Sequence, residues 1–237
     1  MPARKKGSAE LGLDVGSKAA KVATYLLIGR VITFLFTGVA LVLVTRWLGP
    51  YQYGIYTLAI AFAGIFSTLG YFGIGTALNK FIAQYKQLND NKQISAIISN
   101  GLFLIVISAL ILLLICFAFS GYVSVYLYHT VAMSYIINLI AFYLVFVLLF
   151  GVFYDALLGF GQGKYLAFMI IIESVFQALG SITLSFFMPM ATAPIIGLIL
   201  GYFVGFVVGI YFLFKYNKIR IIGPSFKYIK MIVSSVV

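Results

Sequence analysis

The residues of this sequence best suited to chemistry are three ionisable side chains that interrupt long apolar runs: Arg30, Asp155 and Glu173. A charge inside a transmembrane helix costs about 2.5–3.5 kcal/mol on insertion scales, so each one calls for a partner or a function. An ion pair between Arg30 and either carboxylate is one interpretation, and binding of a substrate or a coupling ion is the other. Both place these residues inside a helical bundle.

Two hydroxyl side chains extend the pattern around Arg30. Thr33 and Thr37 follow it at i+3 and i+7, which puts all three on one face of a helix. If this face lines an inward-facing cavity, the guanidinium and the hydroxyls offer donors to an anionic group. The competing interpretation is that the long Arg30 side chain reaches the inner headgroups and binds no ligand.

The two carboxylates are placed symmetrically about a short loop. Asp155 and Glu173 each lie nine positions from Lys164 in that loop. This spacing puts them at similar depth, roughly 13 Å of helix from the inner surface, where they could share a site. Gln177 lies one turn beyond Glu173 and would extend its polar face. Because a carboxylate at this depth can bind a proton or a sodium ion, all three are candidates for ion coupling.

The composition identifies the elements that must position these groups. Of the 237 residues, 63% are hydrophobic and 9% are charged, against about 45–50% and about 25% in soluble domains. A helix needs about 20 apolar residues to cross a bilayer. Six stretches meet this length, at 22–45, 54–78, 94–119, 135–159, 168–188 and 195–214. We therefore predict an all-α, polytopic transmembrane bundle of six spans plus the start of a seventh.

The basic residues predict the orientation of this bundle. The sequence contains sixteen Lys and Arg but only five Asp and Glu, which gives a net charge of +11. With a cytoplasmic N-terminus, Arg46 falls outside, Arg30 lies within the first span and the other basic residues lie inside, as the positive-inside rule requires. This predicts a basic tail over 1–21, a six-helix lobe over 22–214, and a basic linker with a truncated seventh helix over 215–237. The protein is then a multi-pass protein of the cell membrane, and no nucleic-acid partner is expected.

A stripe of small residues marks the sixth span. Gly197, Gly201, Gly205 and Gly209 recur every four positions and form one line along a helix. Such a line lets another backbone approach closely, as membrane helices do when they associate. We interpret it as a packing surface, and a flexible gating element is the alternative.

Other motifs predict no catalytic chemistry. One cysteine, Cys116, and one histidine, His129, make no set of metal ligands. The sequence has no Ser-His-Asp arrangement and no carboxylate pair in an exposed loop. We therefore expect a protein that is not an enzyme and has neither a cofactor nor a metal.

Two motifs in about the first 85 residues resemble the polysaccharide-synthesis flippases, the Wzx-type oligosaccharide exporters of the multidrug/oligosaccharidyl-lipid/polysaccharide superfamily. They are WLGPYQYGIY at 47–56 and GYFGIGTAL at 70–78, the latter followed by Phe81-Ile82-Ala83. The resemblance implies two six-helix lobes around a central cavity, which move polyprenyl-diphosphate-linked oligosaccharide to the outer leaflet by alternating access. This chain would be the first lobe, and its partner would be a second lobe from a C-terminal half or a paired chain.

The resemblance also implies a cationic cavity that suits a lipid diphosphate. Arg30 matches that role best, with Thr33 and Thr37 beside it and Lys80 near the inner mouth as further substrate-binding candidates. Two alternatives stay open. A small-molecule or cation antiporter of the same superfamily would use acidic residues at the site, and a non-transporting scaffold subunit would use the glycine stripe for partner helices.

Overall fold

The computed structural model describes residues 3–127, 132–217, 219–220 and 222–234, and within these ranges it contains helices and no strand. The prediction of an all-α protein is confirmed. A π-helical turn, Val123–Leu127, follows the third helix. The seven α-helices are α1 (Ala3–Tyr71), α2 (Ile74–Gln87), α3 (Asn91–Tyr122), α4 (Ala132–Gly159), α5 (Gly163–Phe187), α6 (Thr192–Asn217) and α7 (Phe226–Ser234).

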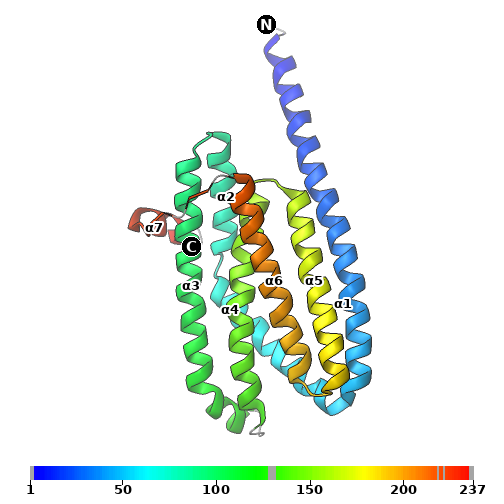
Figure 1. Cartoon of the computed structure of the whole chain (residues 1–237). Coiled ribbons are helices and arrows are strands. Elements are labelled where there is room, and N and C mark those ends of the chain that lie inside the picture. Colours follow the sequence, from blue (N-terminus) through cyan, green and yellow to red (C-terminus); the bar gives the residue numbers. More distant parts are fainter. Residues whose placement is uncertain (1–2, 128–131, 218, 221, 235–237) are drawn as a thin grey trace.

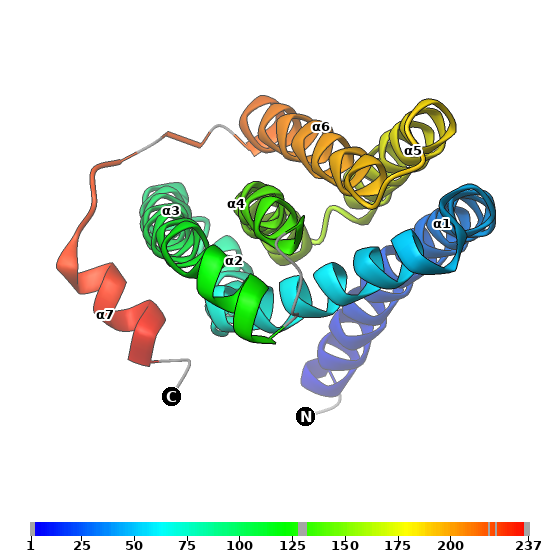
Figure 2. The same ribbon diagram turned by 90° about the horizontal axis from the view of Figure 1, so that it is seen from below.

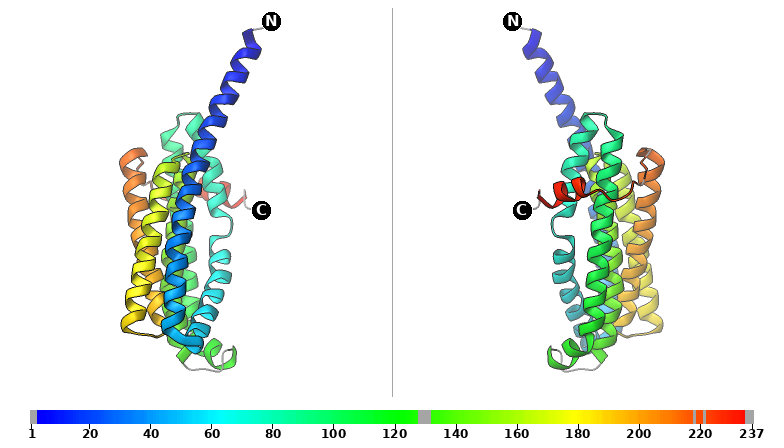
Figure 3. Two further views of the ribbon diagram at one scale, coloured as in Figure 1. Left: turned by 90° about the vertical axis from the view of Figure 1, so that its right-hand side faces the viewer. Right: turned by 90° about the vertical axis from the view of Figure 1, so that its left-hand side faces the viewer.

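Among the described residues, five helical segments are long and apolar enough to cross a membrane. The first, Ala19–Tyr71, has 53 residues, about 80 Å of helix against a hydrocarbon core of about 30 Å. It contains the first predicted span and residues 54–71 of the second, joined at Gly49, whose backbone is not helical. Figure 3 shows the chain turning back toward α2 at this kink. We call residues 3–48 the first arm of α1 and residues 50–71 its second arm.

The kink has a local cause in the sequence. Gly49 has φ 69° and ψ 172°, a conformation that is essentially restricted to glycine. Pro50 follows inside the helix and cannot donate a backbone hydrogen bond. Gln52 then fixes the turn, because its Oε1 accepts a 3.0 Å hydrogen bond from the Ala191 amide between α5 and α6. This hydrogen bond ties the kink to the connection between α5 and α6.

We expect Gly49→Ala to lower the stability of the folded protein by about 1–3 kcal/mol, because a Cβ makes this backbone conformation strained. The measurement is the apparent unfolding midpoint of the purified protein in detergent. Gly54→Ala is the matched control, since Gly54 has no positive φ and a Cβ there meets no atom within 4 Å. Equal midpoints for the two variants would contradict the prediction.

The bundle is organised around α4. Helix α4 packs against α1, α2, α3, α5 and α6, while α5 packs between α1 and α6. Figure 2 shows α4 near the middle, with α5 and α6 on one side and the second arm of α1 on the other. Large apolar side chains face outward, including Phe34 (75% exposed) and Leu114 (65% exposed). Outward apolar side chains of this size fit contact with lipid chains.

The predicted second span, 54–78, is not one continuous helix. The second arm of α1 ends at Tyr71, Phe72 and Gly73 adopt positive φ angles of 32° and 69°, and α2 begins at Ile74. The Ser108 hydroxyl of α3 donates a 2.7 Å hydrogen bond to the Gly70 carbonyl at this break. Interrupted helices are tolerated at membrane depth where protein groups satisfy the backbone, and they commonly line cavities.

After α6, the chain passes around the outer side of α3 and attaches to that helix (Figure 2). Backbone amides in this α6–α7 linker donate to side chains in the first three turns of α3. The bonds run from Arg220 to Ser95 Oγ (3.3 Å), from Ile222 to Ser99 Oγ (3.0 Å) and from Ser225 to Asn100 Oδ1 (2.7 Å). Helix α7 then lies across α3 instead of along it (Figures 1 and 3), so its first residues do not run parallel to the spans.

Candidate functional site

A cavity of about 610 Å³ lies where the second arm of α1 breaks before α2. Its polar lining comes from four helices: the end of α1, the start of α2, and the helices α4 and α6 from later in the chain. The residues that supply it are Ser67, Thr68, Tyr71, Thr76, Tyr154, Asp155 and Tyr202. We call this the main cavity.

Asp155 lies in the main cavity against the start of α2. The Tyr71 hydroxyl donates a hydrogen bond to its Oδ2. A Cβ on Gly75 would lie 2.0 Å from the same oxygen, so glycine is needed at this position for the carboxylate to approach the helix. The first amides of a helix lack intrahelical acceptors and carry partial positive charge, which favours an anion there. The break after Tyr71 therefore creates the local environment of Asp155.

Arg30 faces α4 across the bundle. Its Nη2 donates a 3.2 Å hydrogen bond to the Tyr154 hydroxyl, and Tyr154 lines the main cavity. The described part of the chain shows no ion pair between Arg30 and Asp155 or Glu173. An arginine carries five N–H donors, and the described residues accept from one of them. The guanidinium is thus exposed and contacts the main cavity only through Tyr154, which lines it.

The other three predicted substrate-binding residues have different surroundings. Lys80 is exposed and lies one helical turn after Thr76, which puts it on the cavity-facing side of α2. The Thr33 hydroxyl donates to the Ile170 carbonyl of α5 (3.4 Å), and the Thr37 hydroxyl donates to the Thr33 carbonyl (2.8 Å). The two threonine protons are therefore committed to backbone carbonyls, while their oxygens can still accept.

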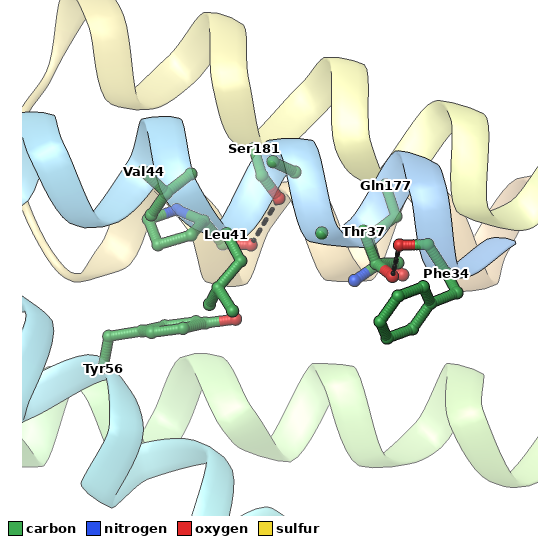
Figure 4. Close-up of a pocket in the computed structure, with 10 residues that line it drawn as sticks. Phe34, Thr37, Leu41, Val44, Tyr56, Gln177 and Ser181 are labelled. Carbon is green, nitrogen blue, oxygen red and sulfur yellow. Dashed lines mark hydrogen bonds between the residues drawn. The ribbon is translucent and has the colours of Figure 1, made fainter.

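Thr37 lines a second pocket, of about 280 Å³. It lies between the two arms of α1, the second half of α5 and the start of α6. Figure 4 shows Thr37 and Gln177 close together on one side and Tyr56 reaching in from the second arm. Ser181 closes the pocket and donates a 3.3 Å hydrogen bond to the Pro194 carbonyl. Gln177, a candidate for ion coupling, and Thr37, a candidate for substrate binding, thus line the same pocket.

Glu173 is the most deeply buried charged side chain of the three. It is 6% exposed, and its Oε1 has no hydrogen-bond partner among the described residues. It does not line the main cavity, whereas Asp155 does. The two carboxylates therefore have different surroundings: Asp155 faces an open cavity, and Glu173 is enclosed by protein.

The glycine stripe of α6 lies against helices of the same chain. A Cβ on Gly197 would come within 2.3 Å of the Ser181 amide nitrogen, and one on Gly201 within 2.8 Å of the Glu173 carbonyl oxygen. Gly205 and Gly209 approach the side chains of Phe150 and Phe153 on α4, each with 2.7 Å to the added carbon. The stripe thus brings α6 onto α5 and α4, and this close approach covers Glu173.

Three tyrosines of the site, Tyr71, Tyr154 and Tyr202, were not selected from the sequence. A tyrosine in an apolar run serves equally well as a packing residue, so its type alone gives no signal. Their positions in the sequence do give a signal, because Tyr154 directly precedes Asp155 and Tyr71 lies in the second of the two motifs. The contacts with Arg30 and Asp155 span 124 and 84 residues of sequence and depend on the fold.

The comparisons with known proteins agree on the kind of molecule. The family described as "Polysaccharide biosynthesis protein" matches residues 19–236. A multidrug resistance MATE family transporter of the MOP superfamily, in an outward-facing conformation, is similar in structure, with a TM-score of 0.77, 17% identity and coverage of 91% of this chain and 50% of that one. A MOP superfamily transporter from Pyrococcus furiosus, described by the reverse polarity of its binding pocket, is also similar in structure. Its TM-score is 0.73 and its sequence identity 15%, and the match covers 92% of this chain and 51% of that one.

This chain thus spans about half the length of the structures it matches. The comparison with curated proteins gives no match.

Proposed function

Because the chain belongs to the polysaccharide biosynthesis protein family, we propose that it forms one lobe of a flippase. Its substrate is a polyprenyl-diphosphate-linked oligosaccharide, which it moves across the cell membrane for the assembly of surface polysaccharide. A second lobe completes the transporter, since the structural neighbours are about twice as long as this chain. Their shared fold with this lobe supports a membrane transporter as the general class.

The observation that carries this proposal is the hydrogen bond from the exposed Arg30 to Tyr154, a residue that lines the main cavity. A guanidinium presents donors in a planar fork that suits phosphate oxygens. Arg30 uses one donor on Tyr154, and Lys80 adds a second cation on the cavity-facing side of α2. The diphosphate docks between these cations, the glycan enters the space between the lobes, and the polyprenyl chain stays in lipid.

The proposed topology has six crossings with the N-terminus in the cytoplasm. The 53-residue apolar segment supplies two of them, because it reverses at Gly49. Residues 22–214 then form the lobe, the tail over 1–21 is cytoplasmic, and residues 215–237 carry the chain toward the next lobe. Rocking of the two lobes exposes the site alternately to each side.

Ion coupling resides in the carboxylates of the same lobe. Glu173 is buried with one oxygen unpartnered, and Asp155 faces the main cavity under the Tyr71 hydroxyl. A buried carboxylate is costly to keep charged without a partner, so binding of a proton or a sodium ion changes its local energy strongly. Gln177, one turn beyond Glu173, contributes a polar group on the same side of α5.

A small-molecule antiporter is the second candidate function. The observation that favours it is the carboxylate of Asp155 in the main cavity, which suits a cationic substrate. The scaffold alternative loses its binding surface, because the glycine stripe is covered by α4 and α5 of the same chain.

We expect Arg30→Ala to lower the flipping rate at least tenfold, because the hydrogen bonds of a charged group contribute about 1.5–3 kcal/mol. The measurement is the transfer of a labelled polyprenyl-diphosphate oligosaccharide in proteoliposomes that hold the full-length protein. Arg46→Ala is the control, since Arg46 is also exposed on the first arm but lies about 24 Å of helix beyond Arg30, beside the kink. Wild-type flipping by Arg30→Ala, or transport of cationic drugs without any glycan lipid, would overturn the flippase proposal.

A further inference from the structure

The outer face of the bundle carries an apolar groove beside α7. The groove has a volume of about 350 Å³ and lies between the broken second arm of α1, α3 and α7. Its lining includes Leu69, Phe72, Ile107, Ile111 and Val233, and each of these side chains is between 39% and 63% exposed. The groove lies on the opposite side of the second arm from the main cavity, which is lined by Thr68 and Tyr71.

Helix α7 places charge next to this groove. Phe226, Lys230 and Val233 follow one another at i, i+4 and i+7 and are all exposed, so they form one outward stripe. Lys227 stands exposed beside it. The opposite face is held by the protein, since Ile232 is fully buried and the Tyr228 hydroxyl donates a 2.6 Å hydrogen bond to Gln93 Oε1 of α3.

The position of α7 is fixed by α3. Three backbone amides of the linker bond to Ser95, Ser99 and Asn100, and α7 lies across α3 (Figures 1 and 3). A short helix that crosses a membrane bundle, with lysines next to exposed apolar side chains, has the pattern of an interfacial helix. Its lysines then stand at the headgroups and the groove beneath it at the depth of the hydrocarbon chains.

From this arrangement we propose that α7 and the groove form a binding site for one anionic phospholipid. The phosphate contacts Lys227 and Lys230, and one acyl chain lies in the groove from Val233 toward Ile111. Leu104 to Ile111 alone provides about 10 Å of apolar wall along α3. Ser108, the one hydroxyl of the lining, donates to the Gly70 carbonyl, so the occupant meets an apolar surface.

The ligand class follows from the charge and polarity of the site. An anionic head with a hydrocarbon tail matches two lysines above an apolar groove, and the inner leaflet supplies such lipids at high local concentration. This inference does not depend on which substrate the protein transports. Because the groove abuts Phe72 and Ile74, an occupied groove packs directly against the break that shapes the Asp155 environment.

The test is retention of phosphatidylglycerol, against phosphatidylcholine, by the full-length protein in native mass spectrometry. We expect Lys227→Gln with Lys230→Gln to weaken phosphatidylglycerol binding by roughly 10- to 30-fold. Lys21→Gln with Lys164→Gln removes two exposed lysines elsewhere and should leave binding unchanged. Equal losses in the two double variants would overturn the proposal, because they would show general attraction of anionic lipid.

A second pair of variants tests the groove itself. Ile107→Trp fills it and should lower phosphatidylglycerol retention, whereas Ile115→Trp should not, since Ile115 is similarly exposed on α3 but lies outside the groove (38% against 39%). No difference between these variants would overturn the assignment of the acyl chain. Displacement of phosphatidylglycerol by an equimolar polyprenyl diphosphate would also overturn the proposal and assign the groove to the transported lipid.

Discussion

A single methyl group added at Gly197 is expected to prevent close packing of α6 on α5. The added Cβ of Gly197→Ala would stand 2.3 Å from the Ser181 amide nitrogen and 2.7 Å from the Ser181 Cα. Backbone atoms cannot move aside as the end of a flexible side chain can, so the helices must separate. Overpacking usually costs about 1–3 kcal/mol, and we expect a loss of about 3 kcal/mol or more here.

The measurement for Gly197→Ala is the yield of monodisperse protein in detergent together with its apparent unfolding midpoint. Gly64→Ala is the matched control, because Gly64 also lies in a long apolar helix but a Cβ there meets no atom within 4 Å. We expect Gly64→Ala to be neutral or slightly stabilising, since alanine favours helix more than glycine. A Gly197→Ala protein with the yield and midpoint of wild type would contradict the packing of α6 on α5.

Replacement of the buried carboxylate is expected to uncouple transport from its driving gradient. Glu173→Gln keeps the size of the side chain but cannot gain or lose a charge. Coupling between two linked sites typically changes affinity by 5- to 150-fold, so we expect stimulation by a proton or sodium gradient to fall about tenfold. The measurement is the flipping rate in proteoliposomes with and without each gradient.

Two comparisons make the Glu173 result specific. Glu173→Asp retains the acid and should keep most of the gradient response, while Asp155→Asn tests the carboxylate in the main cavity. If Glu173→Gln transports with a full gradient response, coupling does not pass through this residue. If wild type itself shows no gradient response, the ion-coupling proposal fails for both carboxylates.

The all-helical fold could be predicted because bilayer thickness sets the length of an apolar helix, which the composition of the runs reveals directly. The break in the second predicted span could not be predicted from the sequence. Gly70, Gly73 and Gly75 mark a place where a helix can bend, but a break at Phe72–Gly73 depends on Ser108 and Asp155 arriving from other helices. The local sequence shows where a backbone can depart from a helix. It does not show which residues of other helices contact that backbone.

The candidate site shows the same division. Arg30, Asp155 and Glu173 stand out in the sequence because charge is rare in apolar runs. Their partners do not, since Tyr154 and Tyr202 are two of 17 tyrosines in a chain rich in aromatic residues. Similar depth along neighbouring helices allows the two carboxylates to share a site, but depth says nothing of the direction in which each side chain points. The structure places Asp155 in the main cavity lining and Glu173 outside that lining.

The attachment of the linker to α3 has a mechanical consequence. The linker contributes backbone amides to all three bonds, and α3 contributes the side chains Ser95, Ser99 and Asn100. These bonds do not depend on the linker side chains, provided that proline does not remove one of the amides. Ile219 is constrained separately, because its side chain is buried in the core. Since α7 is fastened to α3, a displacement of α3 moves α7 with it. In the two-lobe transporter proposed above, the helix that transmits movement to the second lobe is then the third in chain order and not the one that directly precedes the linker.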